Sequence, residues 1–216
     1  MDVTVGRLLQ QAVEARRQGR IAEAERALGD ALKHQPGEPQ ALNLLGLIAL
    51  DRGDFAAARS HFLAAVQVDP KEAALWMNVA SAERGLADAE GEGSALVQAI
   101  AIDQRNLMAQ VRMAQLQQKQ GEAQAAADSW GKVLALTSGL TDIPPALANT
   151  LEEAHQFVRD HNARFAAFVE AGVAEGLSAA DTVVRRRFQA CLDHEFGRRA
   201  VYQNHWSGVP YPFLPA

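Results

Sequence analysis

The chain has 216 residues, a formal net charge of −5 and an isoelectric point near 5.7. This acidic balance argues against general nucleic-acid binding, because neutralising phosphates requires a basic surface. Apolar residues make up 48% of the chain but aromatic residues only 6%, which favours closely packed helices over sheets. The single cysteine, Cys191, excludes an internal disulfide framework, and no run of about 18 apolar residues predicts a membrane span. We therefore expect a cytoplasmic protein.

The dominant signal along the chain is a repeat of 34 residues. Gly19 and Gly53 are separated by this distance, and so are Pro36 and Pro70. A period between about 20 and 50 residues marks an array of small units, each of which buries its apolar face against its neighbours. The period therefore predicts an all-α solenoid with almost no strand.

Four units follow from this period, at residues 5–38, 39–72, 73–106 and 107–140. The second unit is the clearest, because apolar or small residues recur at helical spacing in two successive segments. They are Leu42, Leu45, Gly46 and Ala49 in the first segment and Ala58, Phe62 and Ala65 in the second. We expect Gly46 and Ala58 to lie where the two helices of one hairpin meet, so that added bulk is not tolerated there.

Positions 8, 20 and 27 of the units form a column of small residues. They are Ala12, Ala24 and Ala31, then Gly46, Ala58 and Ala65, then Ala80, Glu92 and Ala99, and finally Ala114, Ala126 and Val133. This pattern resembles the tetratricopeptide repeat, in which small residues let the two helices of a hairpin approach closely. The resemblance implies a right-handed superhelical solenoid of four tetratricopeptide helical hairpins.

Glu92 departs from this column. An unpaired carboxylate is costly to bury, so we expect it to weaken packing within the third hairpin. We also expect the second helix of that hairpin to begin late, near Ser94.

Residues 141–200 predict two further helices that cap the array. Pro144 and Pro145 suit the first turn of a helix, and an apolar stripe follows, made of Leu147, Leu151, Ala154, Val158, His161, Phe165 and Phe168. A second segment begins near Ser178 and ends at Gly197. Residues 201–216 combine prolines with aromatic residues and lack a helical period, which predicts an extended arm.

Motifs that carry catalysis or bind metal are missing from the sequence. None of the six histidines has the spacing of a metal-ligand pair, and there is no glycine-rich phosphate loop and no nucleophile elbow. We interpret His161 as a packed histidine with one hydrogen bond, and Cys191 as a small buried residue. We assign no catalytic and no metal-binding residue in this chain.

In tetratricopeptide domains the first helix of each unit lines the concave face, which implies a peptide-binding groove here. The polar residues at the corresponding positions are Asn43, Asn78, Ser81, Arg84, Arg112, Gln115 and Gln118. Asn78 and Arg112 match two positions of the domains that grip a terminal carboxylate, whereas Asn43, Leu47 and Met108 depart from that pattern. We expect an extended polar segment to bind, chiefly through Asn78 and Arg112. A solvated face without a ligand is the alternative.

The carboxyl-terminal stretch carries a second resemblance. The sequence RFQACLD at 187–193, GRR at 197–199, YQ at 202–203 and YPFLPA at 211–216 resembles the segment joining repeats to enzyme in bacterial aspartyl/asparaginyl β-hydroxylase-like proteins. Phe213 and the stretch from His205 to Gly208 depart from it. In that family the repeats precede a dioxygenase domain that uses Fe(II) and 2-oxoglutarate.

This resemblance implies that the chain is the amino-terminal part of a hydroxylase whose iron ligands lie beyond Ala216. The interface with that missing domain would then include Arg198, Arg199, Tyr202, Trp206, Tyr211 and Phe213. For the basic cluster formed by Arg185–Arg187 with Arg198 and Arg199, a solvated helix face remains the alternative to an interface.

The functional hypothesis is that the repeats hold a polypeptide so that a missing catalytic domain can hydroxylate it. Two alternatives stay open. One is a free-standing adaptor that joins proteins without catalysis, and the other is an assembly factor that dimerises through its aromatic arm.

Overall fold

A computed structural model of the chain describes residues 3–140 and 143–174. Within these ranges the regular structure consists of nine α-helices and contains no strand, which confirms the predicted all-α class. The helices belong to two compact units, one ending at Leu116 and one beginning at Gln117. Several predictions fall outside the described residues. They concern the second capping segment, the arm 201–216 and the interface residues assigned to them.

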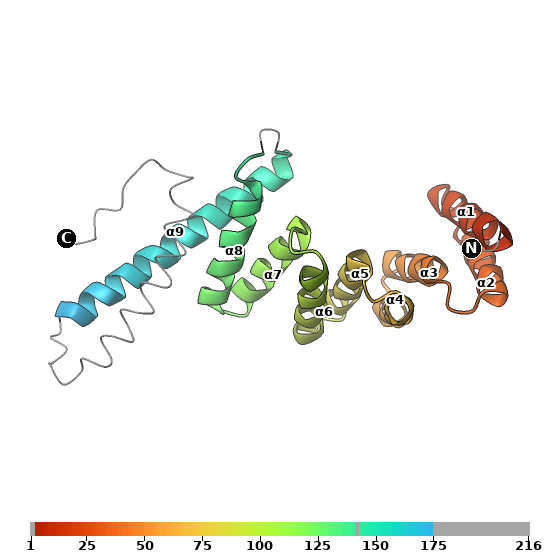
Figure 1. Ribbon diagram of the computed structural model, residues 1–216, viewed down its shortest axis with the longest axis horizontal. Coiled ribbons are helices and arrows are strands. Elements are labelled where there is room, and N and C mark those ends of the chain that lie inside the picture. The colour runs from red at the N-terminus through yellow and green to blue at the C-terminus, as the bar shows by residue number, and fades with distance from the viewer. Residues whose placement is uncertain (1–2, 141–142, 175–216) are drawn as a thin grey trace. The chain divides into compact units, whose positions relative to one another are not determined.

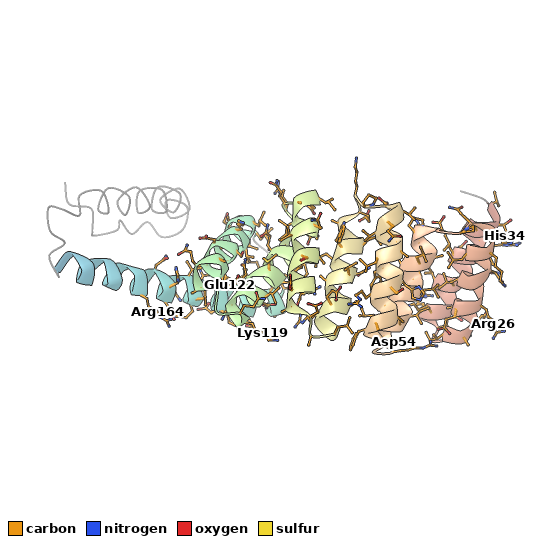
Figure 2. All side chains as sticks on the ribbon, turned by 90° about the horizontal axis from the view of Figure 1, so that it is seen from below. Arg26, His34, Asp54, Lys119, Glu122 and Arg164 are labelled. Carbon is orange, nitrogen blue, oxygen red and sulfur yellow. The ribbon has the colours of Figure 1, made fainter. Side chains whose placement is uncertain are left out.

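Successive helical hairpins build the first unit (Figure 1). They comprise α1 (Val3–Arg17) with α2 (Ile21–His34), α3 (Pro39–Asp51) with α4 (Phe55–Val68), and α5 (Ala73–Gly85) with α6 (Ala89–Ile102), followed by α7 (Leu107–Lys119). The helices α3, α5 and α7 begin 34 residues apart. Each hairpin packs on the next, since α2 contacts α3 and α4 contacts α5. Polar residues such as Arg26, His34 and Asp54 lie at the surface (Figure 2).

The second unit contains α8 (Ala123–Thr137) and α9 (Pro145–Ala174), which pack against each other. The helix expected after Pro144 is thus present. Leu151 and Ala154 of its predicted stripe are buried, and His161 lies 3.0 Å from Gln124 Oε1. Trp130 is the largest fully buried side chain of α8, and its Nε1 donates to Gln118 Oε1 at 3.0 Å.

The column of small residues forms the line of contact within the first three hairpins. Of its twelve members, eleven are small or apolar and buried, among them Ala12, Ala24, Gly46, Ala58 and Ala80. Larger residues fill the space on either side, with Leu28 in the first hairpin and Phe62 in the second, both fully buried. Close approach at the column is what allows these larger side chains to interlock. The predicted packing role of Gly46 and Ala58 is confirmed.

The turn between the two helices of a hairpin repeats the same backbone conformation. Gly19, Gly53 and Gly121 have φ between 74° and 78°, and Ala87, at the equivalent place in the third hairpin, has φ 59°. In the second hairpin the amide of Asp54 donates to the carbonyl of Ala49 at 2.9 Å, and in the third the amide of Asp88 donates to that of Glu83 at 3.0 Å. Hydrogen bonds of this kind satisfy carbonyls at a helix end and require a left-handed residue.

The third hairpin differs from the expectation in where its second helix begins. Helix α6 begins at Ala89, not near Ser94, because the Asp88 side chain accepts a hydrogen bond from the Gly91 amide at 2.9 Å and caps the helix. An aspartate cap offsets the low helix propensity of the glycines in this segment. The expected late start is therefore wrong.

Replacing Ala87 with glycine should stabilise the protein. The left-handed conformation costs a residue with a Cβ atom about 1–2 kcal/mol, and glycine avoids this cost. Part of the resulting gain in stability is lost, because glycine has more conformational freedom in the unfolded chain. We expect Ala87→Gly to raise the free energy of unfolding by about 0.5–1 kcal/mol in urea titrations. The matched change Gly53→Ala should lower the free energy of unfolding by a similar amount. If both changes raised it, or both lowered it, the explanation would be contradicted.

A Cβ atom at Gly46 would lie 2.4 Å from the Phe62 ring, whereas one at Gly29 would have no atom within 4 Å. Both glycines lie inside helices, so alanine improves helix propensity at either site. We expect Gly46→Ala to destabilise by about 1–3 kcal/mol through overpacking and Gly29→Ala to stabilise by up to about 1 kcal/mol. Thermal or urea unfolding measures both, and a stabilising Gly46→Ala would show that the ring moves aside.

Candidate functional site

The candidate site is the set of polar side chains on α3, α5 and α7. Asn78 on α5 donates through Nδ2 to Asn43 Oδ1 on α3 at 2.8 Å, and both residues are half-buried. The two asparagines lie one residue out of phase in the repeat, with Asn43 at position 5 and Asn78 at position 6. This bond therefore joins two neighbouring hairpins through their first helices.

Arg112 on α7 is held by three groups from the preceding hairpin. Its Nη1 donates to Ser81 Oγ at 2.9 Å and to the Met77 carbonyl at 3.3 Å, while Nη2 donates to Glu92 Oε1 at 2.9 Å. The Ser81 hydroxyl in turn donates to the Met77 carbonyl at 2.9 Å. Arg112 thus links α5, α6 and α7 in one network.

Glu92 is therefore a paired residue and not the packing defect expected from the sequence. Only 9% of its side chain and 10% of that of Arg112 are exposed. A carboxylate and a guanidinium that are both removed from water interact strongly when they are hydrogen-bonded to each other. The assumption that the carboxylate of Glu92 is buried unpaired is wrong, because its partner comes from the next repeat.

The remaining predicted groove residues lie at the surface. Arg84, at the end of α5, and Gln115, on α7, are exposed, and neither forms a hydrogen bond or ion pair with another described side chain. Gln118 accepts the hydrogen bond from Trp130. The structure thus joins Asn43 to Asn78 and Ser81 to Arg112, and it leaves Arg84 and Gln115 apart from both pairs.

Apolar side chains accompany the asparagine pair. Leu47 follows Asn43 by one helical turn, and Met77 precedes Asn78, and both are partly buried against the core. Met108, near the start of α7, is 61% exposed. Side chains three or four residues apart share a helix face, so Leu47 places apolar surface beside the amide of Asn43.

Groups of side chains that could hold a metal ion do not occur in the described ranges. No three His, Cys, Asp or Glu side chains gather there as ligands. The pKa of His155 is lowered by burial and, to a smaller extent, by Arg159, while Glu152 acts in the opposite direction. No helix in the described part of the chain is both long and apolar enough to cross a membrane.

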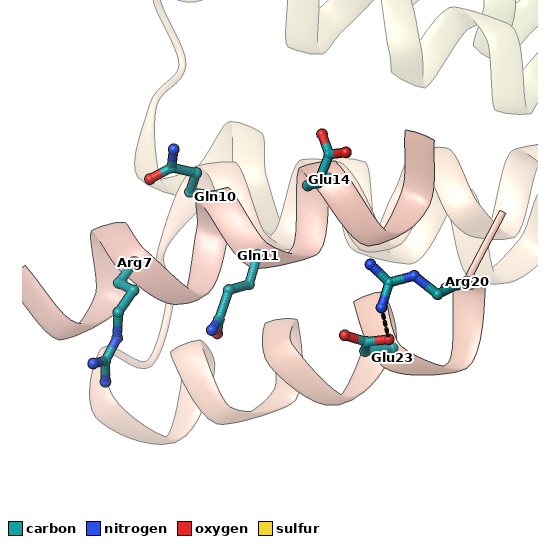
Figure 3. Close-up of a pocket in the computed structure, with 6 residues that line it drawn as sticks. All are labelled: Arg7, Gln10, Gln11, Glu14, Arg20 and Glu23. Atoms are coloured by element: carbon teal, nitrogen blue, oxygen red, sulfur yellow. Dashed lines mark hydrogen bonds and ion pairs between the residues drawn. The ribbon is translucent and has the colours of Figure 1, made fainter. Parts of the chain in front are cut away.

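A depression of about 280 Å³ lies on the first hairpin, whereas the candidate site lies on α3, α5 and α7. It is lined by polar side chains of α1, of α2 and of the residue that precedes α2. They are Arg7, Gln10, Gln11, Glu14, Arg20 and Glu23 (Figure 3). Within it Arg20 pairs with Glu23.

Comparison with known proteins identifies the repeats. The family model of the tetratricopeptide repeat matches residues 9–73 and 48–106. These matches cover the three hairpins α1 to α6 except for the first residues of α1. Residues 9–106 therefore match the tetratricopeptide-repeat family, as the 34-residue period indicated.

Solved structures share the fold. The crystal structure of a MamA protein is 21% identical, with a TM-score of 0.62 over 76% of this chain and 89% of that chain. A mutant of the O-GlcNAc transferase of Thermobaculum terrenum is 25% identical, with a TM-score of 0.57 over 65% of this chain and 28% of that chain. MamA of Desulfovibrio magneticus, from residue 41 to its end, is 19% identical, with a TM-score of 0.58 over 64% of this chain and 78% of that chain. No curated relative matches the chain. The all-α solenoid of tetratricopeptide hairpins is thereby confirmed.

The paired burial of Glu92 and Arg112 predicts a specific pattern of stability changes. Removing one partner leaves the other charge buried without compensation, so Glu92→Ala alone should cost about 3 kcal/mol of unfolding free energy, and so should Arg112→Leu alone. The double variant should recover most of this loss, because no charge is then left buried without its partner. Additive losses in a double-mutant cycle measured by urea unfolding would contradict the pairing.

Proposed function

We propose that the chain binds an extended segment of another protein along α3, α5 and α7. The observation that carries this proposal is the asparagine pair. The bond between Asn78 Nδ2 and Asn43 Oδ1 leaves the Nδ2 donors of Asn43 and the Oδ1 acceptor of Asn78 available. A peptide group presents one donor and one acceptor, which such a pair can satisfy together.

The ligand that this site favours is uncharged at the point of contact. The Arg112 guanidinium already donates to Glu92, Ser81 and Met77, so an anionic group would have to compete with the carboxylate of Glu92. The direct contact between Arg112 and the ligand, expected from the sequence, stays a prediction. Leu47, Met77 and Met108 supply apolar surface for side chains of the bound segment.

A second proposal concerns the parent of this region. The resemblance of residues 187–216 to the linking segment of aspartyl/asparaginyl β-hydroxylase-like proteins supports a role in presenting a polypeptide to a dioxygenase domain. The resemblance implies that this domain would hold Fe(II) and 2-oxoglutarate. Arg198, Arg199 and the aromatic residues of the arm would contact it. A free-standing adaptor is the alternative, and a cytoplasmic location stays a prediction under either proposal.

The genomic reading frame tests the second proposal. Codons for paired histidines followed by an arginine, continuing in frame after Ala216, would support a hydroxylase. A stop codon directly after Ala216 would contradict it and leave the adaptor.

Peptide selection tests the first proposal. Phage-displayed 12-residue peptides selected on the chain should bind more weakly, by about two- to tenfold, when Asn43 or Asn78 is replaced by alanine, because each change removes neutral hydrogen bonds. Fluorescence anisotropy measures the affinities, and Gln98→Ala on an exposed face of α6 is the control. Selected peptides that bind the asparagine variants as tightly as the native chain would place the site elsewhere.

The predicted role of Arg112 needs its own comparison. Arg112→Ala removes the partner of Glu92 and so changes stability as well as surface. Binding should therefore be compared between Glu92→Ala and the double variant Glu92→Ala with Arg112→Ala. A further loss of affinity of about tenfold in the double variant would support direct contact by Arg112, and equal affinities would contradict it.

A further inference from the structure

Each hairpin of the first unit docks on its predecessor through a fixed set of positions on its first helix. In α3 these positions hold Ala41 and Ile48, which are buried in the core of the first hairpin, and Leu44 and Leu45, which pack against that core. The cluster they join includes Val5 and Leu9 of α1 and Leu28 of α2. These four positions of α3 are therefore apolar, and the partly exposed ion pairs of Asp51 with Arg16 and of Arg52 with Glu25 add to the same contact.

The positions of Ala41, Leu45 and Ile48 are apolar and buried in the following first helices as well, whereas the position of Leu44 holds the polar residues Asn78 and Arg112. The equivalents of Ala41, Leu45 and Ile48 are Leu75, Val79 and Ala82 in α5, and Ala109, Met113 and Leu116 in α7. All six are buried, at 9% exposed or less, and all six join the core that the preceding second helices α4 and α6 also line.

In α1 this surface is polar. The equivalents of Ala41, Leu45 and Ile48 are Arg7, Gln11 and Glu14, of which Arg7 and Gln11 are exposed. Together with Gln10 they line the depression on the first hairpin (Figure 3). Arg7 and Gln11 form no hydrogen bond with another described side chain, whereas Glu14 accepts from Gln18 and pairs with Arg17.

We infer that this polar face of α1 closes the stack of hairpins, so that neither a further repeat nor the end of a second copy of the chain can dock there. Docking in the manner of α3 on the first hairpin would remove Arg7, Gln11 and Glu14 from water opposite an apolar surface. Burying charged and amide groups without partners is strongly unfavourable. Terminal repeats of a solenoid require such a polar outer face to remain soluble.

An added hairpin tests the inference in the full chain. Residues 39–72, which form the most regular hairpin, are inserted before Val5, so that the junction keeps the spacing between Glu72 and Ala73. On the native α1 face the added hairpin should leave the urea midpoint of the chain unchanged. On a chain carrying Arg7→Ala, Gln11→Leu and Glu14→Ile, which copies the face of α3, it should raise the midpoint and unfold in a single transition.

A matched control separates docking from general hydrophobicity. Arg26→Ala, Asp30→Ile and Lys33→Leu introduce the same residue types on exposed positions of α2 and should give no increase in midpoint. The inference is overturned if the added hairpin stabilises the chain with the native face, or if it stabilises neither chain. Should the triple variant fail to fold, the double variant Arg7→Ala with Gln11→Leu takes its place in the same comparison.

The triple variant without the added hairpin gives an independent measurement. Its apolar end should cause concentration-dependent association in sedimentation velocity, with the native chain and the α2 control sedimenting unchanged over the same range. A triple variant that sediments like the native chain would show that the polar residues are not what keeps this end from docking.

Discussion

The structure depends on the close approach of two helices within each hairpin, at a column of small residues that recurs every 34 positions. Ala24 and Ala58 are fully buried in this column, and at Gly46 even a methyl group would overlap the Phe62 ring. Because the backbones come so near, the larger residues beside the column are forced into contact with the neighbouring hairpin. Packing within a hairpin and packing between hairpins are thus two results of one constraint.

The third hairpin breaks this pattern twice, and the two exceptions are accommodated differently. Ala87 takes the left-handed turn position that is glycine in the other hairpins, and its backbone simply adopts the strained conformation. Glu92 replaces a small residue in the column, and its charge is neutralised by Arg112 from the following repeat. The first exception stays local. The second makes the third hairpin rely on α7, so that a local departure becomes a link between repeats.

Much of the fold could be predicted from the sequence because the information is periodic. The spacing of Pro36 and Pro70, and of Gly19 and Gly53, placed the hairpins in register, and helix ends followed from the same spacing. The start of α6 was missed because a single aspartate cap outweighed the glycines that follow it. The pairing of Glu92 was missed because its partner is 20 residues away and at a different position of the repeat. Periodicity compares equivalent positions, so it cannot reveal a contact between positions that are not equivalent.

The same limitation affects the candidate site. Asn78 and Arg112 occupy equivalent positions and were expected to act together on a ligand, yet they have different partners. Asn78 bonds to an amide that still has donors available, while Arg112 bonds to a buried carboxylate. Equivalent positions in a solenoid share a location but not a chemical environment, because the environment is set by residues of the neighbouring repeat. A repeat array can therefore keep one backbone and still vary its recognition surface. It does so by changing which polar side chains form hydrogen bonds within the protein and which remain available to a partner.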